Sequence, residues 1–497
     1  TADFEINVER LSASGLSNAA VFLNATDDST GSISMRNSSF DGGGADATLA
    51  GNAQATLAVT GTRIENDPNS VFLLNADDDA ELTTRIQNNI LEDNASAFEM
   101  EISGSAVSDT LFSGNRIENT TSRAVFARFA SSGTHDMTIS GNSLSSVDGD
   151  GLVLVASNGD VDADVSQNTV DTATGRGIVL RTSASGDMDA TASGNILSNV
   201  ASGGVLARST GSSDLDADLS DNQVSNSGAY GLRFQADNAA AQIGSSATEN
   251  TIRDTVDSAV ELIANNDALM DVVVSRNIIV DVAAAGIRSV ASDDSFVRLV
   301  ATFNNISNST DEGISFTAQD DSFADFQAFN NQIASTGNAS GIGLFSSGDS
   351  FTQGVINGNQ IGPTAQQGIE IEGSDTASGF LSITSNQIND TSQDGIRATL
   401  QSTQSQSINV RDNNFQSIGA NAINLTTEDN KGATIFDNQI GTTGGFALRV
   451  DMQSAGLLLN GSTQGDNQYT DATPAPFLNA GGTPAGDGVR INGVVYP

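Results

Sequence analysis

The chain has 497 residues and a formal charge of −41, from 20 basic and 61 acidic residues. A chain this acidic lacks the basic patches that nucleic acids and anionic membranes require, so we exclude both as partners. Cysteine is absent and histidine occurs once, which excludes disulfides and thiolate metal sites and leaves histidine-based acid–base chemistry almost nothing to work with. No apolar run approaches the roughly 18 residues of a membrane-spanning helix, so we predict no membrane insertion.

A repeat of about 27 residues begins near the first residue and organises the sequence. Its marker is the tripeptide Asn-x-aliphatic, and degenerate copies at Glu9, Ser38, Thr62 and Asn467 bring the total to about 18. The marker asparagines are Asn88, Asn115, Asn142, Asn168, Asn195, Asn222, Asn250, Asn277, Asn304, Asn331, Asn359, Asn386, Asn413 and Asn438.

Each period contains three short segments with the alternation of a β-strand. One precedes the asparagine, as at 137–139, and a Gly-Ile-x-Leu-like segment such as 177–180 starts nine residues after it. Three such strands cannot bury a face alone, so each must pair with its counterpart one period away. The pattern predicts an all-β fold, a single parallel β-helix solenoid of about 18 coils over residues 1–460. Residues 461–497 are predicted to form an irregular, Pro/Gly-containing last coil or partial cap.

The succession of Asn-x-Ile and Gly-Ile-x-Leu segments resembles the right-handed parallel β-helix repeats of the pectate-lyase-like superfamily over nearly the whole chain. The resemblance implies a right-handed helix and raises polysaccharide lyase or hydrolase activity. Of the polygalacturonase motifs Asn-Thr-Asp, Asp-Asp, Gly-His-Gly and Arg-Ile-Lys, only Asp-Asp occurs here. Uniform coil lengths and the absence of tryptophan also argue against a sugar cleft. We therefore expect a non-catalytic member, not an enzyme, with no catalytic residues.

The recurrent asparagines are interpreted as an internal ladder rather than a row of binding sites, because a binding site seldom repeats identically in every coil. Each amide side chain can bond the backbone of the next coil. The ladder is predicted for Asn142, Asn168, Asn195, Asn222, Asn250, Asn277, Asn304, Asn331, Asn359, Asn386 and Asn413.

Aspartates recur at the outward positions four and six residues before the asparagine. Carboxylates stacked at the strand spacing of about 4.8 Å repel one another, so something must offset the repulsion. One interpretation is a solvated acidic face, and the other is a bound calcium ion, the one cofactor that we consider and one that the fold does not require. With specific binding, calcium raises the melting temperature and Asp189→Asn reduces the gain. The candidate metal ligands are Asp162, Asp164, Asp189, Asp216 and Asp218.

The central outward position of the Gly-Ile-x-Leu segment carries an apolar stripe edged by arginines. It predicts either a contact surface or a stripe covered by a loop of the chain itself. Further along, this position alternates Arg and Glu, which predicts a charge ladder. The single histidine, His135, is predicted to lie in a surface turn and to be inert. The candidate binding residues are Phe126, Val153, Val179, Leu206, Arg181 and Arg208.

Neither end of the sequence has an amphipathic capping helix, and open strands invite pairing with a further copy. The leading hypothesis is a secreted or cell-surface structural rod, either a fibre or filament subunit that self-associates end to end, or an adhesin stalk. The first alternative is a calcium-dependent polysaccharide lyase or hydrolase that uses Asp162, Asp189 and Asp216. The second is an adhesin that binds an extracellular carbohydrate or protein through the apolar stripe.

Overall fold

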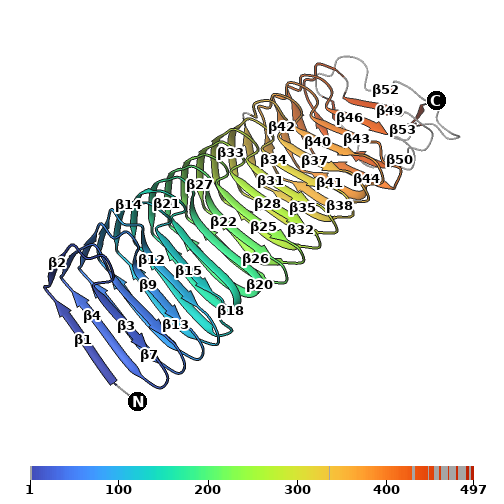
Figure 1. Cartoon of the computed structure of the whole chain (residues 1–497). Coiled ribbons are helices and arrows are strands. Elements are labelled where there is room, and N and C mark those ends of the chain that lie inside the picture. Colours follow the sequence, from blue (N-terminus) through green and yellow to red (C-terminus); the bar gives the residue numbers. More distant parts are fainter. Residues whose placement is uncertain are drawn as a thin grey trace. The chain divides into compact units, whose positions relative to one another are not determined.

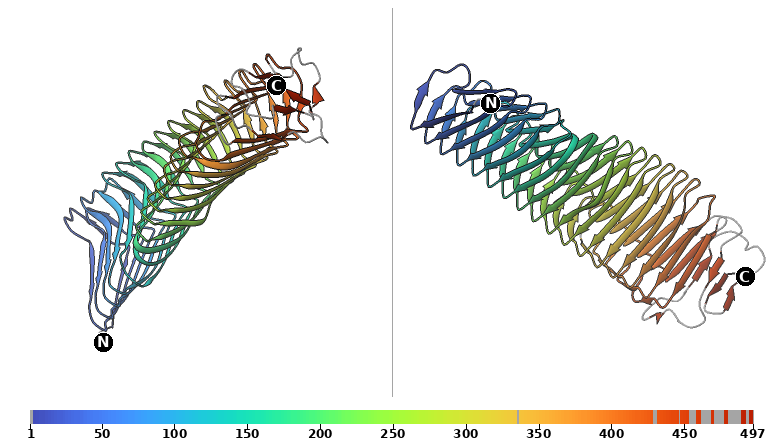
Figure 2. Two further views of the ribbon diagram at one scale, coloured as in Figure 1. Left: turned by 90° about the vertical axis from the view of Figure 1, so that its right-hand side faces the viewer. Right: turned by 90° about the horizontal axis from the view of Figure 1, so that it is seen from below.

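The computed structural model describes residues 3–334, 336–427, 431–445 and 447–452, and five short segments at 458–460, 468–469, 477–479, 489–491 and 494–496. The chain divides into two compact units, Thr1–Thr251 and Ile252–Pro497. Across the described residues the regular secondary structure is β-strand, which confirms the predicted all-β class (Figure 1). Within each unit the strands stack coil upon coil (Figure 2). Of the predicted irregular last coil, most residues lie outside the described part.

The first unit contains three columns of strands. The strands before the marker asparagine are β1 (Asp3–Glu9), β4 (Thr30–Arg36), β7 (Gln54–Thr60), β10 (Glu81–Gln87), β13 (Val107–Ser113), β16 (Thr134–Ser140), β23 (Asp214–Ser220) and β26 (Ala241–Thr248). The strands of the Gly-Ile-x-Leu column are β3 (Val21–Ala25), β6 (Ala45–Leu49), β9 (Ser70–Ala76), β12 (Ser96–Ile102), β15 (Val125–Phe129), β22 (Gly203–Thr210) and β25 (Leu232–Asp237), and two long strands join both columns, β18 (Leu152–Ser166) and β20 (Arg176–Ser193). The short strands after the asparagine are β2 (Ser12–Ser14), β5 (Ser39–Asp41), β8 (Arg63–Glu65), β11 (Ile90–Glu92), β14 (Arg116–Thr120), β17 (Ser143–Val147), β19 (Thr169–Ala173), β21 (Ile196–Val200) and β24 (Gln223–Ser227), and β27 (Thr251–Thr255) spans the unit boundary.

The second unit repeats the three columns. Its Gly-Ile-x-Leu column contains β28 (Val260–Asn265), β31 (Ile287–Ala291), β34 (Ile314–Ala318), β37 (Ile342–Ser346), β40 (Ile369–Gly373), β43 (Ile396–Leu400), β46 (Ile423–Thr427), β49 (Leu448–Met452) and β52 (Phe477–Asn479). The strands before the asparagine are β29 (Leu269–Ser275), β32 (Phe296–Thr302), β35 (Phe323–Phe329), β38 (Phe351–Asn357), β41 (Ser378–Thr384), β44 (Gln406–Arg411), β47 (Lys431–Phe436) and β50 (Leu458–Asn460). The short strands are β30 (Ile278–Val282), β33 (Asn305–Ser309), β36 (Gln332–Ala334), β39 (Gln360–Ile361), β42 (Gln387–Asn389), β45 (Asn414–Gln416), β48 (Gln439–Ile440) and β51 (Gln468–Tyr469), and β53 (Val489–Ile491) and β54 (Val494–Tyr496) form an antiparallel pair.

Within each unit, successive strands of a column pair in parallel one coil apart, as the repeat predicts. Strand β23 shows why the sequence folds this way, because its alternate residues Leu215, Ala217 and Leu219 are buried and the aspartates between them are exposed. With a period of two, one face of every strand fills the interior and the other faces outward. Outward residues that are one period apart in the sequence are therefore neighbours on the outer face. This relation places the residues of every candidate site described below.

The buried asparagines form a hydrogen-bonded ladder within each unit. Asn195 shows the pattern: its Nδ2 donates to Val165 O at 2.8 Å and to Asn222 Oδ1 at 3.0 Å, and its Oδ1 accepts from the Asn168 backbone amide at 2.9 Å. Every asparagine predicted for the ladder is buried. The ladder therefore supplies partners for backbone groups that the turn would otherwise leave unpaired in the interior.

One marker residue was placed one position too early. Asn89, not Asn88, is the ladder residue of its coil, because Asn89 is buried and its Oδ1 accepts from the Thr62 amide at 2.9 Å. Asn88 instead adopts the left-handed backbone conformation, with φ 56°. Asparagine is one of the few residues that tolerate this conformation, so both neighbours fit the sequence marker and only the turn geometry separates them.

Candidate functional site

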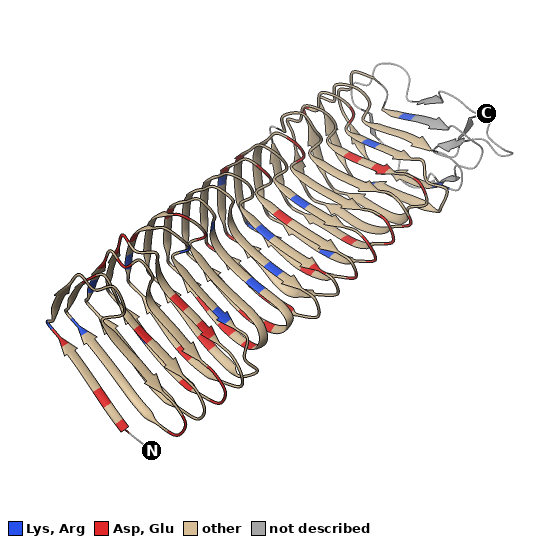
Figure 3. Ribbon diagram, in the orientation of Figure 1, with Lys and Arg blue, Asp and Glu red and all other residues tan. Residues whose placement is uncertain are grey.

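The predicted acidic columns lie on the outer face of the strands that precede the ladder asparagine. Asp136, Asp162, Asp189 and Asp216 are partners in register on β16, β18, β20 and β23. All four are exposed, and Figure 3 shows acidic segments gathered on strands of the first unit. An open hollow runs along this face beside Asp162 and Asp189. The register thus places like charges directly opposite one another across neighbouring strands, which destabilises the sheet.

The five candidate calcium ligands do not converge. Among the described residues, no group of three or more His, Cys, Asp or Glu side chains is placed to hold a metal ion. Instead the carboxylates remain in columns, and the pKa of Asp216 is raised, first by its partial burial and then by Asp189, Asp214 and Asp218. These residues do not fit a preformed calcium site, and calcium binding remains a prediction.

Asp189→Asn is expected to stabilise the first unit at low salt, because Asp189 lies between Asp162 and Asp216 in the column. The expected gain is about 0.2–1 kcal/mol, and screening in molar sodium chloride abolishes it. Thermal unfolding of both proteins at two salt concentrations measures the effect, with calcium added at matched ionic strength as a further condition. If Asp189→Asn lowers the melting temperature in calcium alone, the aspartates bind calcium specifically and repulsion is the wrong account.

The predicted position of His135 is wrong. The residue belongs to strand β16, its side chain is 1% exposed, and its ring lies 4.7 Å from that of Phe129. Its Nδ1 is 3.0 Å from Ser108 Oγ, and its Nε2 has no hydrogen-bond partner. Strand β16 begins at Thr134, within the predicted turn, so the alternation that places Asp136 outward places His135 inward. Burial lowers its pKa from 6.5 to about 4, against the opposing charge of Asp160.

This burial predicts a pH dependence of stability. Because the folded state holds His135 neutral and the unfolded state does not, the unfolded chain binds more protons between pH 6.5 and 4, and stability falls as the pH falls through that window. The wild-type protein is expected to lose about 3 kcal/mol more than His135→Gln over this range. Denaturant unfolding at a series of pH values measures the stability of both proteins. The carboxylates are the same in both, so their contribution cancels in the difference between the two profiles. Parallel profiles would show that His135 does not titrate in this way.

The predicted apolar stripe is buried, not exposed. Val153, Val179 and Leu206 form a small cluster with Tyr230, and all four are less than a tenth exposed. Tyr230 lies in the turn before β25, and its ring passes over Gly203, where a Cβ would come within 2.6 Å of the ring. Gly203, with φ 140°, therefore leaves the space that Tyr230 fills.

The rest of the stripe is capped by arginines. The Arg123 guanidinium lies 3.6 Å from the centre of the half-buried Phe126 ring, and Arg176 Nε donates to the Tyr230 hydroxyl at 3.0 Å. Both candidate arginines, Arg181 and Arg208, are half-buried at its edge. The stripe is thus covered by the chain itself, so the hypothesis of an adhesin that binds through these apolar residues fails.

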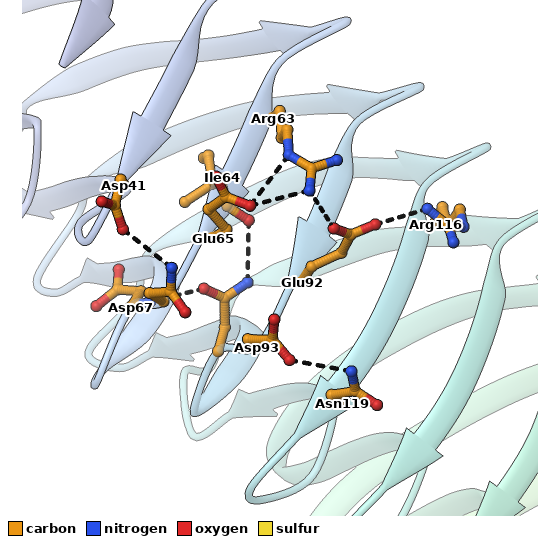
Figure 4. A network of polar contacts seen from close by, with 11 residues as sticks. Asp41, Arg63, Ile64, Glu65, Asp67, Glu92, Asp93, Arg116 and Asn119 are labelled. Atoms are coloured by element: carbon orange, nitrogen blue, oxygen red, sulfur yellow. Dashed lines mark hydrogen bonds and ion pairs between the residues drawn. The ribbon is translucent and has the colours of Figure 1, made fainter. Parts of the chain in front are cut away.

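A polar network that the sequence did not single out lies on the outer face of the short strands (Figure 4). Arg63 Nη2 contacts Glu65 at 2.9 Å and Glu92 at 2.5 Å, and Glu92 also contacts Arg116 at 2.6 Å. Each charge thus has partners on its own strand or in the neighbouring coil. Such surface ion pairs add little to stability. Because the charged groups of this network are paired with one another, we do not consider it a ligand site.

A pair of glutamates in the second unit is a stronger candidate. The outward column there runs Arg288, Ser315, Gly343, Glu370 and Arg397 in register. A Cβ on Gly343 would lie 2.7 Å from the Phe345 ring and 3.0 Å from Glu312 Cγ, so these two side chains together fill the place of the missing one, and Glu312 reaches it from the turn before β34. Gly343 is the register partner of Glu370, and the charge of Glu312 is among those that raise the pKa of Glu370, so the two side chains lie near one another.

Both carboxyl groups are perturbed. The pKa of Glu312 is raised, chiefly by burial, with Arg288 opposing the shift. The pKa of Glu370 is also raised, first by burial and then by Glu372, while Arg397, at 3.7 Å, opposes it. An open depression lined by Glu372, Arg397, Thr399 and Gln401 lies beside Glu370. The lining includes Arg397, the ion-pair partner of Glu370, but neither Glu312 nor Glu370 itself. Carboxyl groups with raised pKa values are a feature of many general acid–base sites.

Of the two glutamates, only Glu370 was singled out from the sequence. Glu370 and Arg397 stand in the predicted charge ladder, which the ion pairs of Glu370 with Arg397 and of Glu261 with Arg288, both at 3.7 Å, bear out. Glu312 lies in a turn, outside the alternating strand positions, and was not singled out. The available signal was Gly343, the one position in the column from 288 to 397 that lacks a side chain.

Comparison with known proteins supports the fold. Residues 26–219 match the family model of the right-handed β-helix region. A search of curated protein sequences finds no match to the chain. Among solved structures, the periplasmic alginate epimerase AlgG is similar over 63% of this chain and 78% of its own, with 10% identity and a TM-score of 0.44. A tailspike protein of E. coli bacteriophage HK620 in complex with pentasaccharide is similar over 76% and 72%, with 14% identity and a TM-score of 0.35. The PL6 family alginate lyase AlyGC is similar over 97% and 100%, with 8% identity and a TM-score of 0.27.

These likenesses concern the coil alone, and they correct one expectation. The sequence led us to expect no enzyme, yet two of the three proteins with this coil are enzymes that act on alginate. The physical reason is that the missing cysteine and scarce histidine remove only some chemistries, while carboxylates remain for acid–base work. None of the described residues forms a helix that could cross a membrane. The coil geometry and the family match together identify residues 26–219 as a right-handed β-helix region, and the second unit repeats the same coil.

Proposed function

We propose that this chain binds and cleaves an acidic polysaccharide outside the cell or at its surface, with Glu312 and Glu370 as the acid–base pair. The observation that supports this is the approach of Glu312 to Gly343, the register partner of Glu370, while Arg397 lies 3.7 Å from Glu370 and lines an open depression. The arginines favour an acidic sugar, because a guanidinium pairs with a carboxylate through two parallel hydrogen bonds.

The proposed chemistry needs one proton on the pair of carboxyls. Burial raises both pKa values, which favours the protonated form of each group, and in the proposal one member of the pair is protonated while the other is charged. The protonated carboxyl gives its proton to the glycosidic oxygen as the bond from that oxygen to the anomeric carbon breaks. The charged carboxyl takes a proton from the water that attacks the anomeric carbon. Both groups are glutamates, so the cycle ends with the proton exchanged within the pair.

The calcium-dependent alternative uses Asp162, Asp189 and Asp216 for elimination instead. These residues share a column in register, and Asp162 and Asp189 line an open hollow, which supports a binding face. Elimination takes a proton from the carbon beside the sugar carboxylate and leaves an unsaturated end, so the product distinguishes it from hydrolysis. A purely structural rod or adhesin stalk, with copies stacked end to end, is the third reading and gives no product at all.

A screen of soluble polysaccharides tests the proposal. Purified chain is incubated with polyuronates and with neutral glucans, each with and without calcium, and reducing and unsaturated ends are measured. We expect reducing ends from an acidic polymer without a calcium requirement, lost in the Glu312→Gln/Glu370→Gln variant. The matched control is Glu118→Gln, which removes an ion-paired glutamate of β14 in the other unit. Equal turnover by the double variant, or no product from any acidic polymer, overturns the assignment of the pair.

A further inference from the structure

Arg181 is a guanidinium without an ionic partner. It lies on the outer face of β20, in register with Val155 one coil before and Arg208 one coil after. Its side chain is half-buried, its Nε is buried without a hydrogen-bond partner, and in the described part of the chain no carboxylate forms an ion pair with it. Burying part of a charge without a partner is costly, so this position is unusual in a chain with three times as many acids as bases.

Its two arginine neighbours are already occupied. Arg208 donates from both Nε and Nη2 to Asp237 Oδ2, at 3.2 and 3.0 Å. Arg176 lies 3.6 Å from Asp150 and holds the Tyr230 hydroxyl. Neither acidic partner forms an ion pair with Arg181, and the two neighbouring arginines repel it. Burial first, and then Arg208 and Arg176, lower the pKa of Arg181, while Asp150, which is not in ion-pair contact with it, opposes the shift; the guanidinium stays charged at neutral pH.

The surroundings extend this positive field across several coils. The guanidinium of Arg123 lies over Phe126, and that of Arg233 lies 3.9 Å from the centre of the Tyr230 ring. Arg181 and Arg208 are register partners in one outward column, and Arg233 follows one coil later in the column beside it, as the register partner of Leu206. A guanidinium therefore recurs in three successive coils at the strand spacing of about 4.8 Å, in a linear array. Val155 adds a half-buried apolar surface beside Arg181. A linear array of this kind matches a chain-like ligand with regularly repeated negative charges.

We infer that Arg181 is a recognition site for the carboxylate of an acidic sugar chain, which its guanidinium binds through two hydrogen bonds while the sugar ring rests on Val155. The ligand supplies the negative charge that the protein does not place beside the Arg181 guanidinium. The ligand class agrees with the proposed function, but the site belongs to the first unit and does not depend on the glutamate pair of the second. An acidic peptide offers the same carboxylate on a flexible backbone and serves as the competing ligand in the test.

Binding is measured by calorimetry in the full chain carrying Glu370→Gln, so that no cleavage interferes and a failure of the catalytic proposal leaves this test intact. The probes are a galacturonate hexamer, a neutral glucose hexamer and a hexaglutamate peptide. The variants are Arg181→Gln, Arg181→Lys and the matched control Arg128→Gln. Arg128 occupies the same outward column two coils earlier, but it is ion-paired with Glu101 at 3.2 Å.

We expect the galacturonate hexamer to bind, Arg181→Gln to weaken it at least about tenfold, Arg181→Lys to weaken it less, and Arg128→Gln to leave it unchanged. Without ligand, Arg181→Gln should keep or raise the melting temperature, because it removes an unpaired charge, whereas a purely structural arginine would lower it. The inference is overturned if Arg181→Gln binds as the parent does. It also fails if the parent binds no acidic hexamer, or binds hexaglutamate or the neutral hexamer equally well.

Discussion

Asn195→Ala is expected to lower the free energy of unfolding of the first unit by about 3–5 kcal/mol. Asn195 is fully buried, and its amide group donates to Val165 O and Asn222 Oδ1 and accepts from the backbone amide of Asn168. Alanine deletes all of these bonds at once. It leaves a buried carbonyl and a buried amide without a partner, and each such orphan costs about 1–3 kcal/mol. Because coils stack only on their neighbours, both adjoining coils lose an anchor.

The measurement is denaturant unfolding followed by circular dichroism, with Asn158→Ala as the matched control. Asn158 is exposed and accepts a single bond, from Ser185 at 3.0 Å, so its loss is expected to cost no more than about 1 kcal/mol. Similar midpoints for the two variants would show that the ladder is no stronger than ordinary surface hydrogen bonding. A lower midpoint for Asn195→Ala alone is the expected outcome.

Glu370→Gln is expected to reduce kcat on the acidic polysaccharide by about 10²–10⁴-fold, with little change in KM. Glutamine keeps the size and hydrogen bonding of the side chain but can neither give nor take the proton. Glu312→Gln should have an effect of the same order. The double variant should be scarcely worse than either single one, because the two carboxyls share one proton and act as a unit. A loss that appears mainly in KM would show that these residues only bind the sugar.

The pH profile separates catalysis from a structural role. Arg397 lowers the pKa of Glu370. If Glu370 is the general acid, its pKa sets the alkaline limb of the kcat profile, and Arg397→Gln should raise that pKa further and move this limb to higher pH. Glu118→Gln, with its carboxyl on another strand column, should leave the profile in place. An alkaline limb that does not move in Arg397→Gln would separate Glu370 from the proton transfer.

Periodic features were predictable from the sequence, and features outside the period were not. The ladder asparagines, the acidic columns and the pairing of Glu370 with Arg397 all depend on register, which a repeat of nearly constant length transmits from coil to coil. Tyr230 and Glu312 come from turns, where side-chain direction depends on local backbone geometry rather than on alternation. Their reach over Gly203 and Gly343 is a tertiary contact that spacing alone does not contain. The burial of His135 was missed because the strand begins earlier than expected, at Thr134, so that a residue assigned to a turn belongs to the inward face of the strand.

The ladder also constrains how such a gene can change length. A ladder asparagine bonds its equivalents in the adjoining coils, 25 to 28 residues away in the sequence, and a strand carbonyl of the preceding coil, such as Val165 O for Asn195. After duplication or loss of one whole period, each asparagine forms the same contacts with a new neighbour. The structure of the other coils is therefore unchanged. Loss of part of a period instead places a strand or turn residue of the next coil beside the asparagine. The hydrogen-bonded ladder is then interrupted at that coil. Recombination between copies can thus alter the number of coils freely, while small insertions are tolerated only in the turns.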